Sequence, residues 1–198
     1  MIRKHHLFLT TTLVVAISVG LIGCASGVPS TEFTNPQFDF SFVDRVAVIP
    51  FENLTNDRQA GLRATRLTNT ELLASHSVDV VEFGEVQAAL LKMPGAQFGR
   101  VAVPSTEQVI SLGQELQVQA LILGNVTQSE TLRSGTVLIP VVTLDMHMVE
   151  TETGATVWAA THTEKGSSIG AKILGTGAQP ISDATRRCVQ RILESLVK

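Results

Sequence analysis

Residues 45–57 read RVAVIPFENLTND, and this stretch decides the fold. Its first seven residues are nearly all apolar, as in a strand that is buried on both faces of a sheet. The polar run from Asn53 to Asp57 predicts a turn whose side chains can cap a helix, which then continues to about Ser75. The residues of this helix that are predicted to face the core are Leu62, Leu72 and Leu73. A buried strand joined directly to a helix indicates the α/β class.

The remaining chain continues this alternation of strands and helices. Ser105 and Gln108 have the spacing of a capping box, and Glu150–Gly154 is a hairpin signal with a glycine available for positive φ. Together the elements predict an α/β domain built on a mixed sheet with flanking helices. In chain order they are a strand at 78–83, a helix at 84–93, a loop at 94–104, a helix ending at 116, strands at 120–126, 136–149 and 155–163, a loop at 164–181 and a helix ending at 196.

The N-terminus has the pattern of an export signal. Arg3 and Lys4 precede an uncharged apolar stretch, which ends in Leu-Ile-Gly followed by Cys24. This ending resembles the lipobox of bacterial lipoproteins, in which the cysteine thiol takes a diacylglycerol and the amine freed by cleavage takes a third acyl chain. Cys24 is therefore the predicted lipidation site. The alternative is a transmembrane anchor, but the 16 residues at 7–22 fall short of the roughly 17 to 25 that span a bilayer.

Three regions follow from this interpretation. Residues 1–23 form a lipoprotein signal peptide, residues 24–43 a lipidated N-terminus and flexible linker, and residues 44–198 a periplasmic α/β domain. Phe38, Phe40 and Phe42 alternate along the end of the linker. An edge strand added to the domain sheet is therefore an alternative for this part. Ala25 follows the acylated cysteine and resembles the pattern that directs lipoproteins to the outer membrane. The predicted localisation is therefore the periplasmic face of the outer membrane.

The composition of the chain argues against nucleic acid as a partner. Without residues 1–23 the chain carries 13 basic and 18 acidic residues and no tyrosine, so it lacks the excess of basic residues that is typical of nucleic-acid binding.

The cysteines allow no internal cross-link. With Cys24 blocked by lipid, Cys188 is the only thiol, and no intramolecular disulfide can form. Cys188 shares a four-residue spacing with Ala184 and Ile192, which predicts a core position on a helix rather than a nucleophile.

No catalytic residues, cofactor site or metal site are predicted. If Glu150 pairs with Ala155 in the hairpin, His147 lies opposite Trp158, and Asp145 and His162 share its face. By this pairing the two histidines are four strand positions apart, roughly 13 Å at about 3.3 Å per residue. Two ligands that each lie about 2 Å from one zinc ion cannot be so distant. The sequence therefore predicts that the protein is not an enzyme.

Three segments in a fixed order resemble a known family. Residues 46–57, residues 121–124 (LILG) and residues 144–158 (LDMHMVETETGATVW) are similar to the CsgG-like, TolB-N-terminal-like and LpoB-like periplasmic lipoprotein domains. The resemblance covers about residues 45–163 and the closing helix. It implies a domain that resembles an anticodon-binding fold and acts in protein binding or assembly, and it brings no catalytic residues.

The predicted function is a membrane-anchored periplasmic lipoprotein that binds a protein partner in the cell envelope, with self-association left open. The alternative is a CsgG-like oligomeric secretion component. Membrane hairpins of that kind need about 20 residues plus a turn, whereas only residues 127–135 separate the two predicted strands. A periplasmic hydrolase is the third possibility, and no group of residues supports it.

Overall fold

The computed structural model describes residues 30–93, 104–135, 137–166 and 179–196. Its seven-stranded sheet has the order β1-β7-β6-β5-β2-β4, with β3 paired to β5 outside this path. The strands β2, β3 and β4 run parallel to their neighbours, while β1, β5, β6 and β7 pair antiparallel with one another. The strands are β1 (Thr31–Thr34), β2 (Arg45–Val48), β3 (Glu52–Asn53), β4 (Asp79–Val80), β5 (Ala120–Ser134), β6 (Val137–Glu150) and β7 (Thr156–Lys165).

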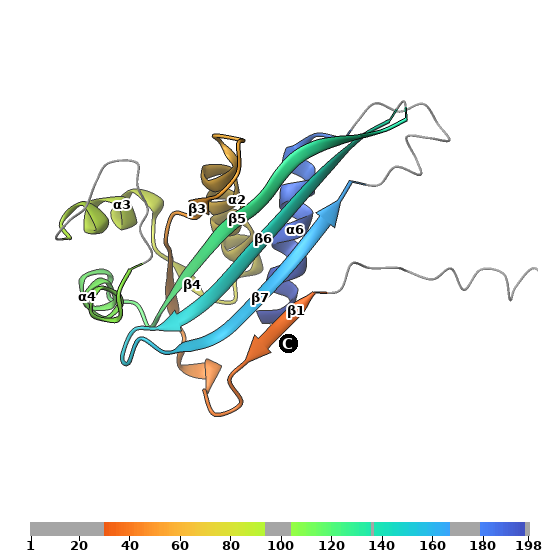
Figure 1. Cartoon of the computed structure of the whole chain (residues 1–198). Coiled ribbons are helices and arrows are strands. Elements are labelled where there is room, and N and C mark those ends of the chain that lie inside the picture. The colour runs from red at the N-terminus through yellow and green to blue at the C-terminus, as the bar shows by residue number, and fades with distance from the viewer. Residues whose placement is uncertain (1–29, 94–103, 136, 167–178, 197–198) are drawn as a thin grey trace, which may run out of the picture.

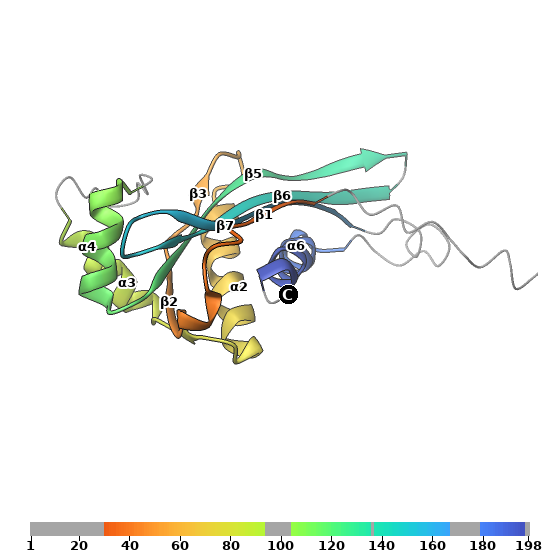
Figure 2. The same cartoon turned by 90° about the horizontal axis from the view of Figure 1, so that it is seen from below.

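Helices flank the sheet on both faces, which confirms the predicted fold class (Figure 1). Two of them, α2 and α6, cover one face, which we call the helix face. The other two, α3 and α4, lie over the opposite face at one end of the sheet only (Figure 2). The helices are α2 (Ala60–Ser75), α3 (Phe83–Leu91), α4 (Thr106–Leu116) and α6 (Ile181–Leu196), with a 3₁₀ turn η1 at Phe40–Phe42. None of the described helices is long and apolar enough to cross a membrane.

The first strand and helix form where the sequence predicts, with two corrections. Pro50 has no N–H to donate, and the strand splits there into β2 and β3. In α2 only Leu72 of the three predicted core leucines is buried, because Leu62 and Leu73 are exposed. The helix packs closely through small residues instead, and its buried threonines donate their hydroxyls to carbonyls four residues earlier. The buried residues are Ala60, Gly61, Ala64, Thr65, Thr68 and Leu72.

Several local predictions are confirmed. The Ser105–Gln108 capping box is present at α4, and Gly154 turns the β6–β7 hairpin with a φ of 76°. Gly124 closes the LILG segment, and a Cβ atom there would lie 2.7 Å from the carbonyl oxygen of Asp145 and 3.0 Å from the ring of Phe51. The glycine therefore allows close packing of β5 against its neighbours.

The N-terminal segment differs from the predicted linker. Of residues 24–43, those from 31 onward fold onto the sheet, where β1 pairs with β7 from Thr31 opposite Thr161 to Thr34 opposite Trp158. The chain then turns through η1, and the rings of Phe38 and Phe40 meet edge to face. Both rings pack against the core on the helix face. The edge strand that the alternating phenylalanines left open is thus present, although it lies at 31–34, before them.

Candidate protein-binding surface

The predicted lipidation site lies outside the described residues. Cys24 falls within residues 1–29, so lipidation, like the signal peptide before it, stays a prediction. The expected loops at 94–104 and 164–181 also fall largely outside them. The structure describes the domain that this predicted anchor would hold.

The predicted pairing of His147 with Trp158 is wrong, and a β-bulge is the reason. Glu150 does pair with Ala155 through its backbone N–H, as expected. Val157 is then an extra residue in β7, so Met148 pairs with Trp158 and His147 pairs with Ala159. A bulge of one residue moves every following side chain to the other face of the sheet. Trp158 therefore points to the helix face and His147 to the opposite one.

The same register separates the groups that the sequence placed on one face. His162 pairs with Leu144 and lies on the helix face, whereas Asp145 and His147 lie on the other. His162 contacts Glu164, which accepts a hydrogen bond of 2.9 Å from Arg187 on α6. Among the described residues no group of three or more metal-ligating side chains comes together.

Cys188 occupies the core position that its spacing predicts. The thiol is fully buried on α6 and donates to the backbone oxygen of His162 at 3.3 Å. Burial raises the pKa of this thiol to about 12. Because the thiolate is the reactive form, Cys188 is inert at neutral pH.

Beyond α3 and α4, no described helix lies over the sheet on the side opposite the helix face, and we call this part the open face (Figure 2). Its central residues are polar and bond to each other across strands. Thr161 donates to Asp145 at 2.6 Å, and Thr143 lies 2.9 Å from the hydroxyl of Thr163. Burial lowers the pKa of His147 although the charge of Asp145 opposes this, so His147 is neutral at pH 7. The centre of the open face is thus a set of polar side chains that bond to each other, with Asp145 as its charged member.

A second uncovered feature is an arm, formed by residues 128–134 of β5 and 137–143 of β6, which is two-stranded in its outer part, where β7 no longer pairs with β6. It projects beyond the helices at one end of the sheet (Figure 1). The sequence predicts a break after Val126, but β5 continues to Ser134 and pairs with β6 throughout. On the arm Leu132 is 44% exposed and Leu138 is 42% exposed. Among the described residues, the arm part of β5 pairs with β6 alone, so its outer edge has free backbone groups.

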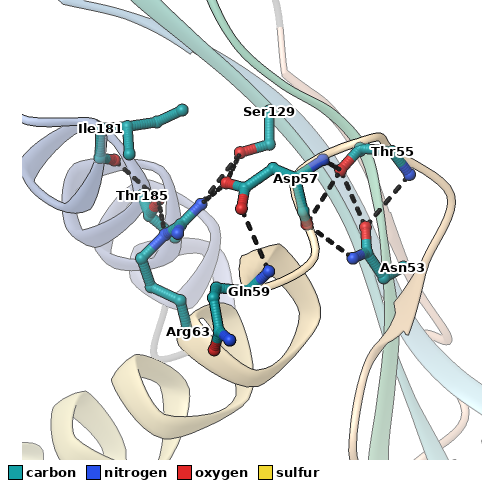
Figure 3. A network of polar contacts seen from close by, with 8 residues as sticks. All are labelled: Asn53, Thr55, Asp57, Gln59, Arg63, Ser129, Ile181 and Thr185. Atoms are coloured by element: carbon teal, nitrogen blue, oxygen red, sulfur yellow. Dashed lines mark hydrogen bonds and ion pairs between the residues drawn. The ribbon is translucent and has the colours of Figure 1, made fainter.

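A polar network holds the base of the arm (Figure 3). Arg63 on α2 forms an ion pair of 2.5 Å with Asp57 and donates a hydrogen bond of 2.9 Å to Ser129 on β5. Ser129 in turn donates to Asp57 at 2.9 Å. Arg63 also donates to Thr185 on α6 at 3.2 Å. The β3–α2 loop, both helices of the helix face and the arm thus meet at one arginine.

The β3–α2 loop is itself fixed by side chains that the sequence identified as helix-capping. Asn53 donates to the backbone oxygen of Asp57 at 2.7 Å and accepts from the hydroxyl of Thr55 at 2.8 Å. Asp57 accepts from the backbone N–H of Gln59 at 3.1 Å, just before α2 begins. The predicted capping is therefore wrong in detail, because the cap residue of α2 is Gln59 and its side chain makes no capping hydrogen bond. The turn instead positions Asp57 for Arg63.

Ser129 reaches this network because of a second bulge. Between Val126 and Gln128 the β5–β6 register shifts by one residue, which turns Ser129 to the helix face and Gln128 to the open face. Without this extra residue, the alternation of the strand would direct Ser129 away from Arg63. The sequence offered no signal for it beyond the polar run at 127–131.

Removing the charge of Asp57 should loosen the base of the arm. Burial raises the pKa of Asp57, but hydrogen bonds from Arg63, Gln59 and Ser129 and the charge of Arg63 outweigh it and hold the pKa below its usual value of 3.8. Asp57→Asn should lower the free energy of unfolding at pH 7 by about 1–2 kcal/mol, the scale of a charged hydrogen bond. Because the folded-state pKa is depressed, this contribution is present above pH 3.8 and is lost as the pH falls through the folded pKa.

Urea denaturation of both proteins at neutral and acid pH measures this effect. The wild type and Asp57→Asn should differ at neutral pH and converge in acid. Glu152→Gln removes the same charge from an exposed residue of the hairpin turn and serves as the control. An equal loss in Asp57→Asn and Glu152→Gln would contradict the role of the network.

The comparisons with known proteins show the fold. No family model and no curated protein matches the chain. Among solved structures, the PelC dodecamer from Paraburkholderia phytofirmans is similar with a TM-score of 0.58 and 18% identity, covering 85% of this chain and 96% of PelC. Lipoprotein GNA1162 from Neisseria meningitidis is similar with a TM-score of 0.55 and 14% identity, covering 78% of this chain and 98% of that one.

The LpoB C-terminal domain from Escherichia coli, from the family that the sequence resembles, reaches a TM-score of 0.45 at 17% identity, over 75% of this chain and 92% of that one. That likeness is too low to add to the argument. The chain therefore has the fold of PelC and of lipoprotein GNA1162, both of which it covers over almost their full length.

Proposed function

We propose that this chain is a lipid-anchored protein of the bacterial envelope that acts by binding proteins. The observation that carries the proposal is the arm, which extends a free strand edge and two exposed leucines beyond the body of the domain. Unpaired strand edges bind extended segments through their backbone groups, and exposed apolar side chains on them add affinity. The anchor is Cys24, and Ala25 after it supports the periplasmic face of the outer membrane as its location.

Binding rather than catalysis is supported by the chemistry of the domain. The thiol of Cys188 is inert at neutral pH, because burial raises its pKa to about 12. The half-buried polar groups of the open face are bonded to each other and not directed at a common point. Likeness of fold to a lipoprotein from Neisseria meningitidis supports the same assignment.

Among possible protein partners we propose a second copy of this chain, which binds through the arm. The PelC structures of the same fold are dodecamers. The arm lies at one end of the sheet and β1 forms an edge on another side, so contacts between copies would join different surfaces. Such head-to-tail contacts close into rings when the rotation between subunits allows it. This supports an oligomer in which the arm of one copy contacts the body of the next.

Native mass spectrometry of the lipidated protein in detergent tests this proposal. The wild type should form one discrete multimer. The double variant Leu132→Ser/Leu138→Ser should shift it to monomers, because the two leucines lie on opposite faces of the arm and the variant removes the exposed leucine from each face. Leu73→Ser, at a leucine of α2 that is 52% exposed, should leave the multimer intact. A monomeric wild type, or a double variant that assembles normally, would refute self-association through the arm.

A further inference from the structure

The tether and the first strand together restrict how the domain can sit on its membrane. This restriction depends on the lipidation of Cys24, which is part of the proposed function. Seven Cα–Cα steps join Cys24 to Thr31, the first residue of β1. At about 3.6 Å per step, the lipidated residue cannot lie more than about 25 Å from the start of β1.

This reach is shorter than the domain is wide. A domain of about 155 residues has a radius of gyration of about 15 Å, and its full width is more than twice that value. The tether therefore keeps the start of β1 closer to the membrane than the width of the domain. In both views β1 begins at the end of the strand that lies away from α3 and α4 (Figures 1 and 2).

β1 is firmly part of the sheet and is not an extension of the tether. Its four residues pair with β7, and Asn35 just after it donates its backbone N–H to Val157 at 2.8 Å. All four residues of β1 are exposed, and among the described residues no strand pairs with its outer side. The membrane thus lies within reach of an unpaired sheet edge.

The edge presents an aromatic ring on the open face. Phe33 is 50% exposed, and its partner on the neighbouring strand is the small residue Ala159. Thr31, the other β1 residue on this face, is uncharged. Glu32 pairs with Ala160 on the helix face and accepts a hydrogen bond from Ser30. The side of the edge that bears Phe33 therefore carries no charge of its own.

We propose that the β1 edge rests on the membrane that holds the lipid, with Phe33 inserted among the lipid headgroups. Apolar residues of membrane-surface proteins enter this region, where burial of the ring is favourable. The acidic balance of the chain excludes attraction to anionic lipid as the cause. The contact is apolar and held by the tether, so it is insensitive to salt.

A fluorescent label on a single cysteine tests this orientation. Phe33→Cys and Leu91→Cys each create one accessible thiol, since acylation blocks Cys24 and Cys188 is buried and inert. The two positions are matched, with 50% of Phe33 and 48% of Leu91 exposed, and Leu91 ends α3 at the far end of the sheet. The lipidated full chain is labelled with an environment-sensitive dye and inserted into phosphatidylethanolamine vesicles that contain brominated phosphatidylcholine.

Brominated lipid should reduce the emission of the label at position 33 about twofold, and high salt should not reverse this. The label at position 91 should keep its emission. Equal quenching at both positions, or none at position 33, would overturn the proposed orientation while leaving lipidation intact. The wild type is the separate control for the anchor, because it should take up no label. Labelling of the wild type would show a free Cys24 and overturn the anchor and the orientation together.

Discussion

Cys24→Ala should abolish acylation of this protein completely. Alanine has no thiol to receive the diacylglycerol, and no other residue of the chain offers an equivalent site. Each methylene of an acyl chain adds about 0.8 kcal/mol of membrane affinity, and a single acyl chain gives only reversible binding. Stable binding to the membrane therefore depends on the several acyl chains that Cys24 carries. Cells grown with radiolabelled palmitate should label the wild type and leave Cys24→Ala unlabelled.

The second cysteine provides the matched control. Cys188→Ala removes a thiol that is buried on α6, and should keep the full palmitate label because this residue cannot be reached by the acylating enzyme. After a carbonate wash the wild type and Cys188→Ala should remain with the membranes. Undiminished label in Cys24→Ala, or no label in the wild type, would remove the lipoprotein assignment and with it the proposed function.

Trp158→Ala should cost a large part of the stability of the domain. Trp158 is fully buried on the helix face, and its indole N–H donates to the hydroxyl of Ser195 on α6 at 3.3 Å. Truncation of a buried tryptophan to alanine typically costs about 3–5 kcal/mol, because the lost contacts and the remaining cavity add. Domains of this size are stable by only about 5–15 kcal/mol.

Urea denaturation followed by circular dichroism measures the loss, since Trp158 is the only tryptophan and its fluorescence disappears with it. Trp158→Phe keeps most of the buried volume and should cost about 1–2 kcal/mol, mainly through the hydrogen bond and a smaller cavity. A midpoint for Trp158→Ala equal to that of the wild type would show that α6 does not depend on this side chain.

Periodicity and turn chemistry were enough to predict much of the fold. The β6–β7 hairpin, the cap at Ser105 and the buried place of Cys188 each depend on residues close in sequence, and all three are confirmed. The core face of α2 was predicted wrongly at Leu62 and Leu73. Their size suggested burial, but close packing of a helix on a sheet selects small residues instead.

The errors at the surface have one common origin. Each of the two bulges adds a single residue to a strand, and this changes the face of everything that follows. One bulge moved Trp158 away from His147, and the other brought Ser129 to Arg63. At the β7 bulge Val157 and Trp158 are both buried, and at the β5 bulge residues 127–131 are all polar. Neither place has the apolar alternation that would reveal an extra residue, so the network at the base of the arm could not be predicted.

The edge strand β1 also has a consequence for how the chain folds. Its partner Thr161 lies 130 residues after Thr31 in the sequence, whereas β5, β6 and β7 follow one another through short turns. Contacts between distant residues require a large loss of chain entropy and form late, while hairpins form locally and fast. We expect β5–β7 to assemble first and β1 to close the sheet last, so the part of the domain nearest the predicted anchor becomes ordered only when folding is complete.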